Sequence, residues 1–348
     1  MSLARPLASV PDPVNRKTRW TDAELMAVDF PEPRWAVPGL LCEGLNLLAG
    51  APKLGKSWLS LGLGAAIANG EPALDTIEVE RGPVLYCALE DTGRRLQRRR
   101  RQMLSAGSCA APLLTLETAC PTMTSGGEGL LIDWLEANPH ARLVIIDTFE
   151  KMRGSTPPGM SAYAADYAAA ARFKRIADYY NVPFLLIHHV RKQGAEDFQA
   201  MVSGTNGLTG AVDAILVLER ARGQADAVLH VTGRDVQEND YALTFNPTAG
   251  AWTLLDGPAA DHLMHDTRAQ ISRYVRANPG STPKAISQAT GINANTIRKT
   301  CTRMAEDNQL HSTAGAYYLT EPNDSTDTAE LSQLSLRHST PSGPGQRQ

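Results

Sequence analysis

Short apolar runs of strand length recur along the first two thirds of the chain, separated by longer segments in which apolar residues keep a helical spacing. The strand-like runs lie at residues 45–49, 84–88, 143–146, 184–187, 214–218 and 228–232. The helical segments lie between the early runs, at residues 56–69, 91–106, 128–137 and 161–180. Buried strands that alternate with helices are typical of βαβ units, so the pattern predicts an α/β fold with a mostly parallel sheet.

The pattern changes after residue 232, where no further helical segment follows the strands of this core. Two runs, at residues 241–245 and 251–255, flank the sequence Asn246-Pro247-Thr248-Ala249-Gly250. Two strands joined by a five-residue turn rich in Asn, Pro and Gly read as an antiparallel hairpin. The α/β core is therefore expected to end in an antiparallel C-terminal hairpin.

A second, smaller domain is expected over residues 266–320. Helices are predicted at residues 267–277, 283–290 and 293–307, followed by a short hairpin around 310–319 with Gly315 at its turn. This order resembles a winged helix-turn-helix. We expect a flexible N-terminal arm over residues 1–30, the main domain over 31–256, a linker over 257–265 and a disordered tail over 321–348.

Composition narrows the classes of protein. The chain has 348 residues, 43% of them hydrophobic and 20% charged, which is typical of a soluble globular protein. Its formal net charge of −3 excludes a protein that is basic over its whole surface. With no long apolar run and no apolar core near the N-terminus, we expect a cytoplasmic protein without a membrane partner. The five cysteines form no Cys-x-x-Cys pair, which favours reduced thiols over a zinc site.

A phosphate-binding loop is indicated between the first strand and the first helix of the core. The sequence Gly-Ala-Pro-Lys-Leu-Gly-Lys-Ser at residues 50–57 fits the pattern G-x-x-x-x-G-K-[ST]. Glycines let the backbone N–H groups turn toward phosphate oxygens, and the helix N-terminus adds partial positive charge. We expect ATP to be held by Lys56 at the β- and γ-phosphates, with Ser57 as a Mg²⁺ ligand. The predicted nucleotide-binding residues are Gly50, Ala51, Pro52, Lys53, Leu54, Gly55, Lys56, Ser57 and Trp58.

Two carboxylates follow other strands of the core. Asp147 ends the run at 143–146 and is a candidate second Mg²⁺ ligand. Glu90 follows the run at 84–88, at the strand end where α/β sheets bind ligands, and is a candidate for activating water. The alternative is that Glu90 and Asp91 only cap the following helix.

The ordered motifs resemble a known family. The segments GLNLLAGAPKLGKSWLSL, GPVLYCALED, LVIIDT, PFLLIHH, GAVDAILVLE and VTGRD are similar to RecA-type ATPases of the plasmid RepA hexameric helicase kind, which are related to the DnaB and KaiC groups. The resemblance covers about residues 35–256.

The resemblance implies a RecA-like ATPase core that assembles into a homo-oligomer, most simply a hexameric ring. Glu90 then matches the water-activating glutamate and Asp147 the Walker B aspartate. His188 and His189 match a polar sensor of the γ-phosphate, and Arg234 matches an arginine finger that enters the neighbouring subunit's site. The alternative for Arg234 is pairing with Asp235 or Glu238. Thr232 replaces a lysine often present in this group, which favours a weaker motor.

Basic residues suggest contact with DNA. Two loops are expected to face a ring's channel, one over about residues 151–161 with Lys151 and Arg153, the other over about 190–204 with Arg191 and Lys192. Residues 266–320 contain seven basic and three acidic residues, although the whole chain is acidic. Arg298, Lys299 and Arg303 in their third helix are candidate DNA contacts, unless this domain docks proteins instead.

An arginine run, from Arg94 to Arg101, lies on the helix after Glu90 and fits a subunit interface, a phosphate-binding surface or a solvated face. Together these features predict an ATPase that acts on DNA as a replicative helicase or helicase-like motor in plasmid or phage replication or recombination, with a primase as a candidate partner. The alternatives are an ATP-switched DNA-binding regulator and a non-motor ATPase that loads or partners a primase or helicase.

Overall fold

The fold was analysed in a computed structural model of the chain, which describes residues 19–156, 158–190, 206–220, 226–256 and 259–320. The chain divides into two compact units, residues 1–259 and residues 260–348. Each unit has its own hydrophobic core and is described by itself.

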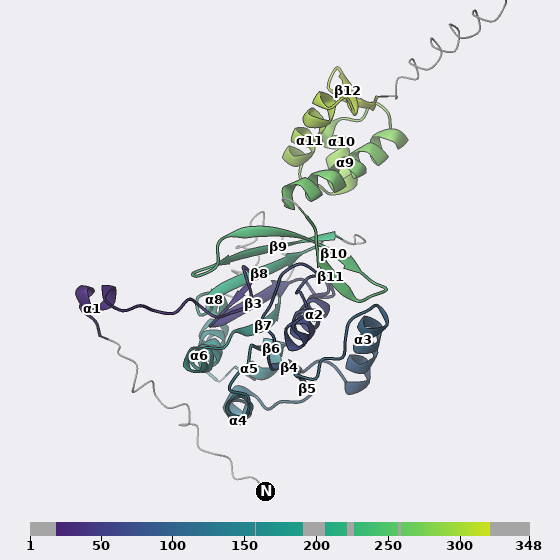
Figure 1. The fold of residues 1–348 in the computed structure, drawn as a ribbon. Coiled ribbons are helices and arrows are strands. Elements are labelled where there is room, and N and C mark those ends of the chain that lie inside the picture. The colour runs from purple at the N-terminus through teal and green to yellow at the C-terminus, as the bar shows by residue number, and fades with distance from the viewer. Residues whose placement is uncertain (1–18, 157, 191–205, 221–225, 257–258, 321–348) are drawn as a thin grey trace, which may run out of the picture. The chain divides into compact units, whose positions relative to one another are not determined.

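The first unit is built on a sheet with the strand order β11-β10-β9-β8-β3-β7-β6-β4-β5 (Figure 1). Its strands are β3 (Leu45–Gly50), β4 (Val84–Ala88), β5 (Leu114–Glu117), β6 (Leu143–Asp147), β7 (Phe184–His189), β8 (Ala214–Glu219), β9 (Asp226–Gly233), β10 (Asn239–Asn246) and β11 (Ala251–Leu254). The segment from β8 to β5 in this order is parallel, whereas β9, β10 and β11 are antiparallel. The predicted α/β fold with an antiparallel C-terminal hairpin is confirmed.

Helices cover both faces of the sheet (Figure 1). They are α2 (Lys56–Asn69), α3 (Gly93–Ser105), α4 (Gly127–Ala137), α5 (Phe149–Arg153), α6 (Ala162–Tyr180) and the short α8 (Asn206–Thr209). One core joins apolar residues of α2 and α3 to the sheet, and a second joins those of α4, α5 and α6. Because side chains alternate along a strand, Leu185 and Ile187 of β7 enter the first core, and Phe184 and Leu186 enter the second.

Strand direction decides which residues can share a site. The strands β3, β4, β6 and β7 run in parallel, so their carboxyl ends meet at one edge of the sheet. The strand β9 runs antiparallel to β8, and Gly233 at its end pairs with Ala214 at the start of β8. The residue that follows Gly233 therefore lies at the opposite edge.

Several elements differ from the prediction. The strand β5 was missed because it is a partly exposed edge strand with a mixed apolar and polar sequence. The short pair β1 (Trp35–Val37) and β2 (Leu41–Cys42) was missed as well. Lys151 and Arg153 lie in α5 rather than in a loop, and Arg153 pairs with Asp166 of α6, so this part of the predicted channel loop is wrong.

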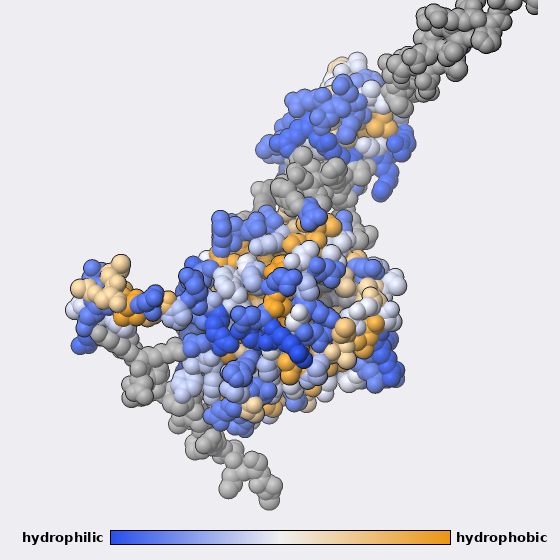
Figure 2. All heavy atoms as spheres, viewed as in Figure 1, coloured by the Kyte–Doolittle hydropathy of each residue, from blue (hydrophilic) through white to orange (hydrophobic). Residues whose placement is uncertain are grey.

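The predicted N-terminal arm contains a short helix, α1 (Asp22–Met26), within its described part. Thr21 and Glu24 form a capping box, in which each side chain accepts a hydrogen bond from the other residue's backbone N–H. Leu25, Met26 and Phe30 are exposed, and Figure 2 shows orange atoms over this segment.

The second unit contains α9 (Ala259–Ala277), α10 (Pro283–Thr290), α11 (Ala294–Glu306) and a hairpin of β12 (Leu310–Thr313) and β13 (Ala316–Leu319). A single bridge also pairs Ser281 with Tyr317. Its core joins Ile271, Ile286, Ile297 and Met304. The helix α9 begins at Ala259 rather than at residue 267, so residues 259–265 of the predicted linker are helical.

In the described part of the chain, no helix combines the length and the apolar character that crossing a membrane requires. The predicted tail, residues 321–348, lies outside the described residues.

Candidate active site

The predicted phosphate loop joins the carboxyl end of β3 to the start of α2. Two of its glycines are required by geometry. Gly50 has φ +156°, and a Cβ there would lie 2.7 Å from the Leu218 carbonyl oxygen. Gly55 has φ +105°, and a Cβ there would lie 2.9 Å from the Trp252 ring. The loop can therefore curl only with glycine at these two positions.

Lys56 is buried inside the curl of its own loop, with 3% of its surface exposed. Its Nζ donates hydrogen bonds to the carbonyl oxygens of Gly50 at 2.6 Å and Ala51 at 3.0 Å. Burial lowers the pKa of Lys56 to about 8, although the nearby carboxylates of Asp147 and Glu90 oppose this shift. The ammonium is thus held at the start of α2, where a helix N-terminus favours the binding of a phosphate.

Asp147 ends β6 and is buried next to α2. It accepts a hydrogen bond of 2.7 Å from the Tyr86 hydroxyl. Burial raises the pKa of Asp147, while hydrogen bonds with the Ser57 and Tyr86 hydroxyls oppose the shift. The Ser57 hydroxyl and the Asp147 carboxylate together offer the hard oxygen ligands that Mg²⁺ prefers.

Glu90 lies just beyond β4, at the same edge of the sheet. Its Oε1 accepts a hydrogen bond of 3.4 Å from the Thr148 hydroxyl, and its side chain is about half exposed. The N-cap of α3 is Thr92, and Asp91 instead forms ion pairs with Arg95 at 2.9 Å and with Arg99. The alternative in which Glu90 and Asp91 cap α3 is therefore wrong.

His189 ends β7 between Lys56 and Glu90. Its Nδ1 lies 3.1 Å from Lys56 Nζ, and its Nε2 lies 3.8 Å from Glu90 Oε2. An ammonium can only donate, so Nδ1 accepts the hydrogen bond from Lys56, and the proton of the neutral ring is on Nε2, facing Glu90. His189 is thus placed to connect the phosphate-binding lysine with the candidate catalytic carboxylate.

His188 lies on the other face of β7, because adjacent strand residues point to opposite faces. Its ring meets Phe149 edge-on at 6.3 Å, and burial lowers its pKa. Its buried Nε2 has no hydrogen-bond partner among the residues that the structure describes. The two histidines were predicted as one sensor, but only His189 reaches Lys56.

Arg234 follows β9 and lies at the sheet edge opposite the phosphate loop. Its backbone N–H donates to the Asp213 carbonyl, and its guanidinium lies 3.6 Å from the Asp213 carboxylate, so the predicted alternative partners Asp235 and Glu238 are wrong. The side chain is 68% exposed. The register places Gly233 level with Asn46, four residues before Gly50, so about 13 Å of strand separates Gly233 from the phosphate loop, and Arg234 lies one residue further away.

The other predicted nucleotide-binding residues differ in exposure. Pro52 and Lys53 are exposed at the tip of the loop, and Leu54 packs partly buried against the first core. Trp58 does not face the loop: its ring packs against Phe245 at 6.2 Å, and Arg99 lies over it at 5.3 Å.

Tyr86, Thr148 and Trp252 were missed as parts of this site. Period-2 alternation places Tyr86 and Ala88 on one face of β4, and this signal was available in the sequence. Trp252 is far from the loop in the sequence, and its contact with Gly55 depends on the tertiary fold.

The structure describes some of the candidate DNA-binding residues and not others. Arg191 and Lys192 lie outside the described residues. Arg298, Lys299 and Arg303 are exposed on α11, while Ile297 and Met304 of the same helix enter the core. Of the arginine run, Arg94, Arg95, Arg98 and Arg101 are exposed, and Arg95 and Arg99 form ion pairs with Asp91.

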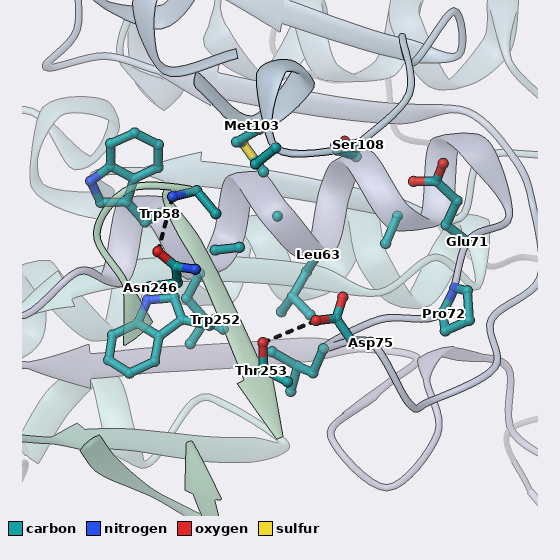
Figure 3. A pocket seen from close by; sticks show the side chains of 18 of the residues that line it. Trp58, Leu63, Glu71, Pro72, Asp75, Met103, Ser108, Asn246, Trp252 and Thr253 are labelled. Carbon is teal, nitrogen blue, oxygen red and sulfur yellow. Dashed lines mark hydrogen bonds between the residues drawn. The ribbon is translucent and has the colours of Figure 1, made fainter. Parts of the chain in front are cut away.

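A separate pocket of about 540 Å³ runs along α2 (Figure 3). Its walls come from α2, the end of α3, residues 71–75 and the β10–β11 hairpin. Trp58, Asn246 and Trp252 gather at one end of it, and Glu71 and Pro72 lie at the other. Lys56, Glu90 and Asp147 do not line this pocket.

Comparison with known proteins identifies the family and the fold of the first unit. A family model described as AAA domain matches residues 10–195. The structure of a DnaB-like replicative helicase, described with its interactions with primase, is similar with a TM-score of 0.51 and 15% identity over 67% of this chain and 66% of that one. This likeness shows a shared RecA-like fold.

Two further structures are similar with lower TM-scores. One, described as an ATPase domain, has a TM-score of 0.49 and 14% identity over 62% of this chain and 85% of that one. The RadB recombinase has a TM-score of 0.43 and 17% identity over 63% of this chain and 92% of that one. No curated protein matches the sequence.

The lowered pKa of Lys56 predicts how nucleotide affinity depends on pH. The ammonium that pairs with phosphate is present below about pH 8 and is lost above it. The affinity for a non-hydrolysable ATP analogue with Mg²⁺ should therefore be level near pH 7 and should fall by up to about tenfold per pH unit above 8. Calorimetric titration at several pH values measures this.

The matched control is Lys56→Arg, whose guanidinium keeps its charge throughout this range. Its affinity, although weaker, should show no inflection near pH 8. An affinity of the unmodified protein that stays constant between about pH 7 and 9 would contradict the assigned role of Lys56.

Proposed function

The chain belongs to the AAA domain family, and we propose that it is an ATP-hydrolysing, DNA-directed motor with a RecA-like core, a RepA-type replicative helicase or helicase-like enzyme. In this proposal it works in the cytoplasm as a homo-oligomer, most simply a hexameric ring, in plasmid or phage replication or recombination. ATP and Mg²⁺ are its cofactors.

One observation carries the proposal: Lys56, Asp147, Glu90 and His189 converge at the carboxyl edge of the parallel strands. Direct contacts link Lys56 to His189, His189 to Glu90, and Asp147 to Tyr86. A phosphate loop alone is common to many nucleotide-binding proteins, whereas the additional carboxylate at the end of β4 supplies what hydrolysis needs.

Each residue has a distinct task in this chemistry. Lys56 and the N–H groups at the start of α2 bind the phosphate oxygens, and Ser57 and Asp147 are the residues that would hold Mg²⁺. Mg²⁺ held by these residues would neutralise negative charge on the phosphates. Glu90 orients and deprotonates the attacking water, and His189, which lies between Lys56 and Glu90, fixes their positions relative to each other.

The position of Arg234 is an argument that the protein assembles into a homo-oligomer. Because it lies at the sheet edge opposite its own phosphate loop, it can complete a nucleotide site only on another copy of the chain. Its guanidinium would then neutralise charge on the phosphates in trans. The site of one chain is incomplete in this view, and two copies share it.

Features of the second unit are an argument that the protein acts on DNA. We propose that it is a winged helix-turn-helix, with α10 and α11 as the helix pair and β12–β13 as the wing. Arg298, Lys299 and Arg303 are exposed on α11, where they would contact phosphates or base edges. Arg191 and Lys192 would add contacts within the ring's channel.

Primase is a proposed partner, by analogy with the interactions described for the DnaB-like helicase. An ATP-switched DNA-binding regulator, or a loader of a primase or helicase, would use the same core. The basic residues of the segment 266–320 favour site selection, which is the task of the regulator. Only the motor requires ATP-driven unwinding of a forked duplex.

Removal of the Glu90 carboxylate should separate binding from hydrolysis. In Glu90→Gln the shape of the side chain is kept and the general base is lost, so ATP should still bind while kcat falls by roughly 100-fold or more. Phosphate release and analogue binding, measured on the same preparation, test this. Glu150→Gln, which changes an exposed acid of α5, serves as the control and should keep its turnover. Full activity of Glu90→Gln would mean that another group activates water.

Mixing variants tests the role of Arg234. Lys56→Ala and Arg234→Ala should each be inactive alone. In mixed assemblies, an intact phosphate loop from one chain meets an intact Arg234 from the other, so part of the turnover should return. Steady-state phosphate release across mixing ratios measures this, with the mass of the assemblies checked in parallel.

A mixture of Lys56→Ala with Glu90→Gln provides the control. Both changes damage the same side of the shared site, so this mixture should stay inactive. If mixed assemblies form and neither mixture recovers turnover, Arg234 does not act in trans.

A further inference from the structure

Trp252 of the β10–β11 hairpin contacts the phosphate loop. This residue is 5% exposed, and its indole Nε1 donates a hydrogen bond of 3.1 Å to the Gly55 carbonyl oxygen. Its ring also occupies the space that a Cβ at position 55 would need. The hairpin therefore fixes the peptide at the start of α2 both by contact and by a directional hydrogen bond.

The Gly55 carbonyl is a sensitive point of the loop. It belongs to the same planar peptide as the Lys56 N–H, and in a trans peptide these two groups point in opposite directions. The Lys56 N–H is one of the first-turn donors that have no partner within the helix. Gly55 is the N-cap of α2 and offers no side-chain cap. The Trp58 and Leu59 N–H groups of α2 also donate to this carbonyl, so Trp252 adds a third hydrogen bond, from outside the loop, to the peptide that carries the Lys56 N–H.

A row of side chains in tilted ring and cation–π contacts surrounds Trp252. Phe245 lies 5.0 Å from the Trp252 ring, and the Arg220 guanidinium lies 5.3 Å from both rings. Phe245 also meets Trp58 of α2, so the row joins the hairpin to the helix that follows the phosphate loop.

The row continues toward the candidate catalytic carboxylate. Trp58 lies under the guanidinium of Arg99, a residue of α3. Arg99 forms an ion pair with Asp91, the residue after Glu90. The side chains that hold Trp252 are thus linked to the turn that carries Glu90.

We propose that Trp252 is a positioning residue for phosphate binding, which orients the Gly55–Lys56 peptide of the phosphate loop toward the phosphates of a nucleoside triphosphate. That the ligand is a nucleoside triphosphate rests on the proposed function. That Trp252 orients the Gly55–Lys56 peptide does not depend on it. It assigns to the C-terminal hairpin a task within the nucleotide site of its own chain. Trp252 contacts no reacting atom and acts only through the loop.

The test compares two tryptophan variants that lose the same kind of group. Trp252→Phe keeps an aromatic ring in the row and removes the N–H donor. Trp134→Phe is the matched control, because the Trp134 Nε1 donates to the Thr115 hydroxyl on the other side of the fold, at 3.3 Å. Both variants are first compared by thermal unfolding, so that a general loss of stability is recognised.

Hydrogen exchange without nucleotide is the first readout. The amide hydrogens of Trp58 and Leu59 bond to the Gly55 carbonyl, both at 3.0 Å. In Trp252→Phe they should exchange about fivefold faster, the factor that corresponds to the loss of one hydrogen bond. In Trp134→Phe they should exchange as in the unmodified protein. Equal exchange in both variants would overturn the inference, whether or not the protein hydrolyses ATP.

Kinetics are the second readout. Trp252→Phe should raise the KM for ATP about fivefold and change kcat by less than about twofold, because the loop is misaligned before chemistry begins. An unchanged KM together with altered exchange would overturn the link to phosphate binding. If the unmodified protein neither binds nor hydrolyses ATP, the proposed function fails, and the exchange result still decides whether Trp252 positions the loop.

Discussion

The burial of the charged Lys56 ammonium is the constraint on which the rest of the site depends. A charge in this position needs compensation, and the carbonyls of Gly50 and Ala51, the His189 ring and the nearby carboxylates of Asp147 and Glu90 provide it. These groups come from the ends of β3, β4, β6 and β7. Only parallel strands whose carboxyl ends meet at one edge can bring them together. The order and direction of the strands therefore determine which residues form the site.

The same topology excludes Arg234 from the site of its own chain. The antiparallel strand β9 returns the chain to the opposite edge, where Asp213 holds the Arg234 backbone and lies close to its guanidinium. Asp213 is itself buried, accepts a hydrogen bond of 2.8 Å from the Leu45 N–H and pairs with Lys174 at 2.9 Å. The exposed arginine thus rests on a rigid base at the start of β3, whose other end is the phosphate loop. These two positions support the proposal that two copies of the chain share one site.

Local sequence signals were sufficient for the parts of the fold that depend on burial and backbone freedom. Strands buried on both faces, such as β4 and β6, stand out as continuous apolar runs, and the glycines at positions 50 and 55 mark the loop. Elements without such a run, such as the edge strand β5 and the short helix α5, were missed. Strand alternation would have separated His188 from His189, since only one of two adjacent residues can face α2. The contacts Arg234–Asp213 and Trp252–Gly55 join distant segments, and a single sequence contains no signal for either pair.

The central claim is that one chain supplies only part of a hydrolytic site and that a second copy supplies Arg234. The most direct test measures ATP turnover per chain over a wide range of protein concentration, with the mass of the assembly determined at each point. The account predicts that turnover per chain rises with concentration in step with the mass. Turnover per chain that stays constant down to concentrations at which the protein has the mass of a single chain would contradict it.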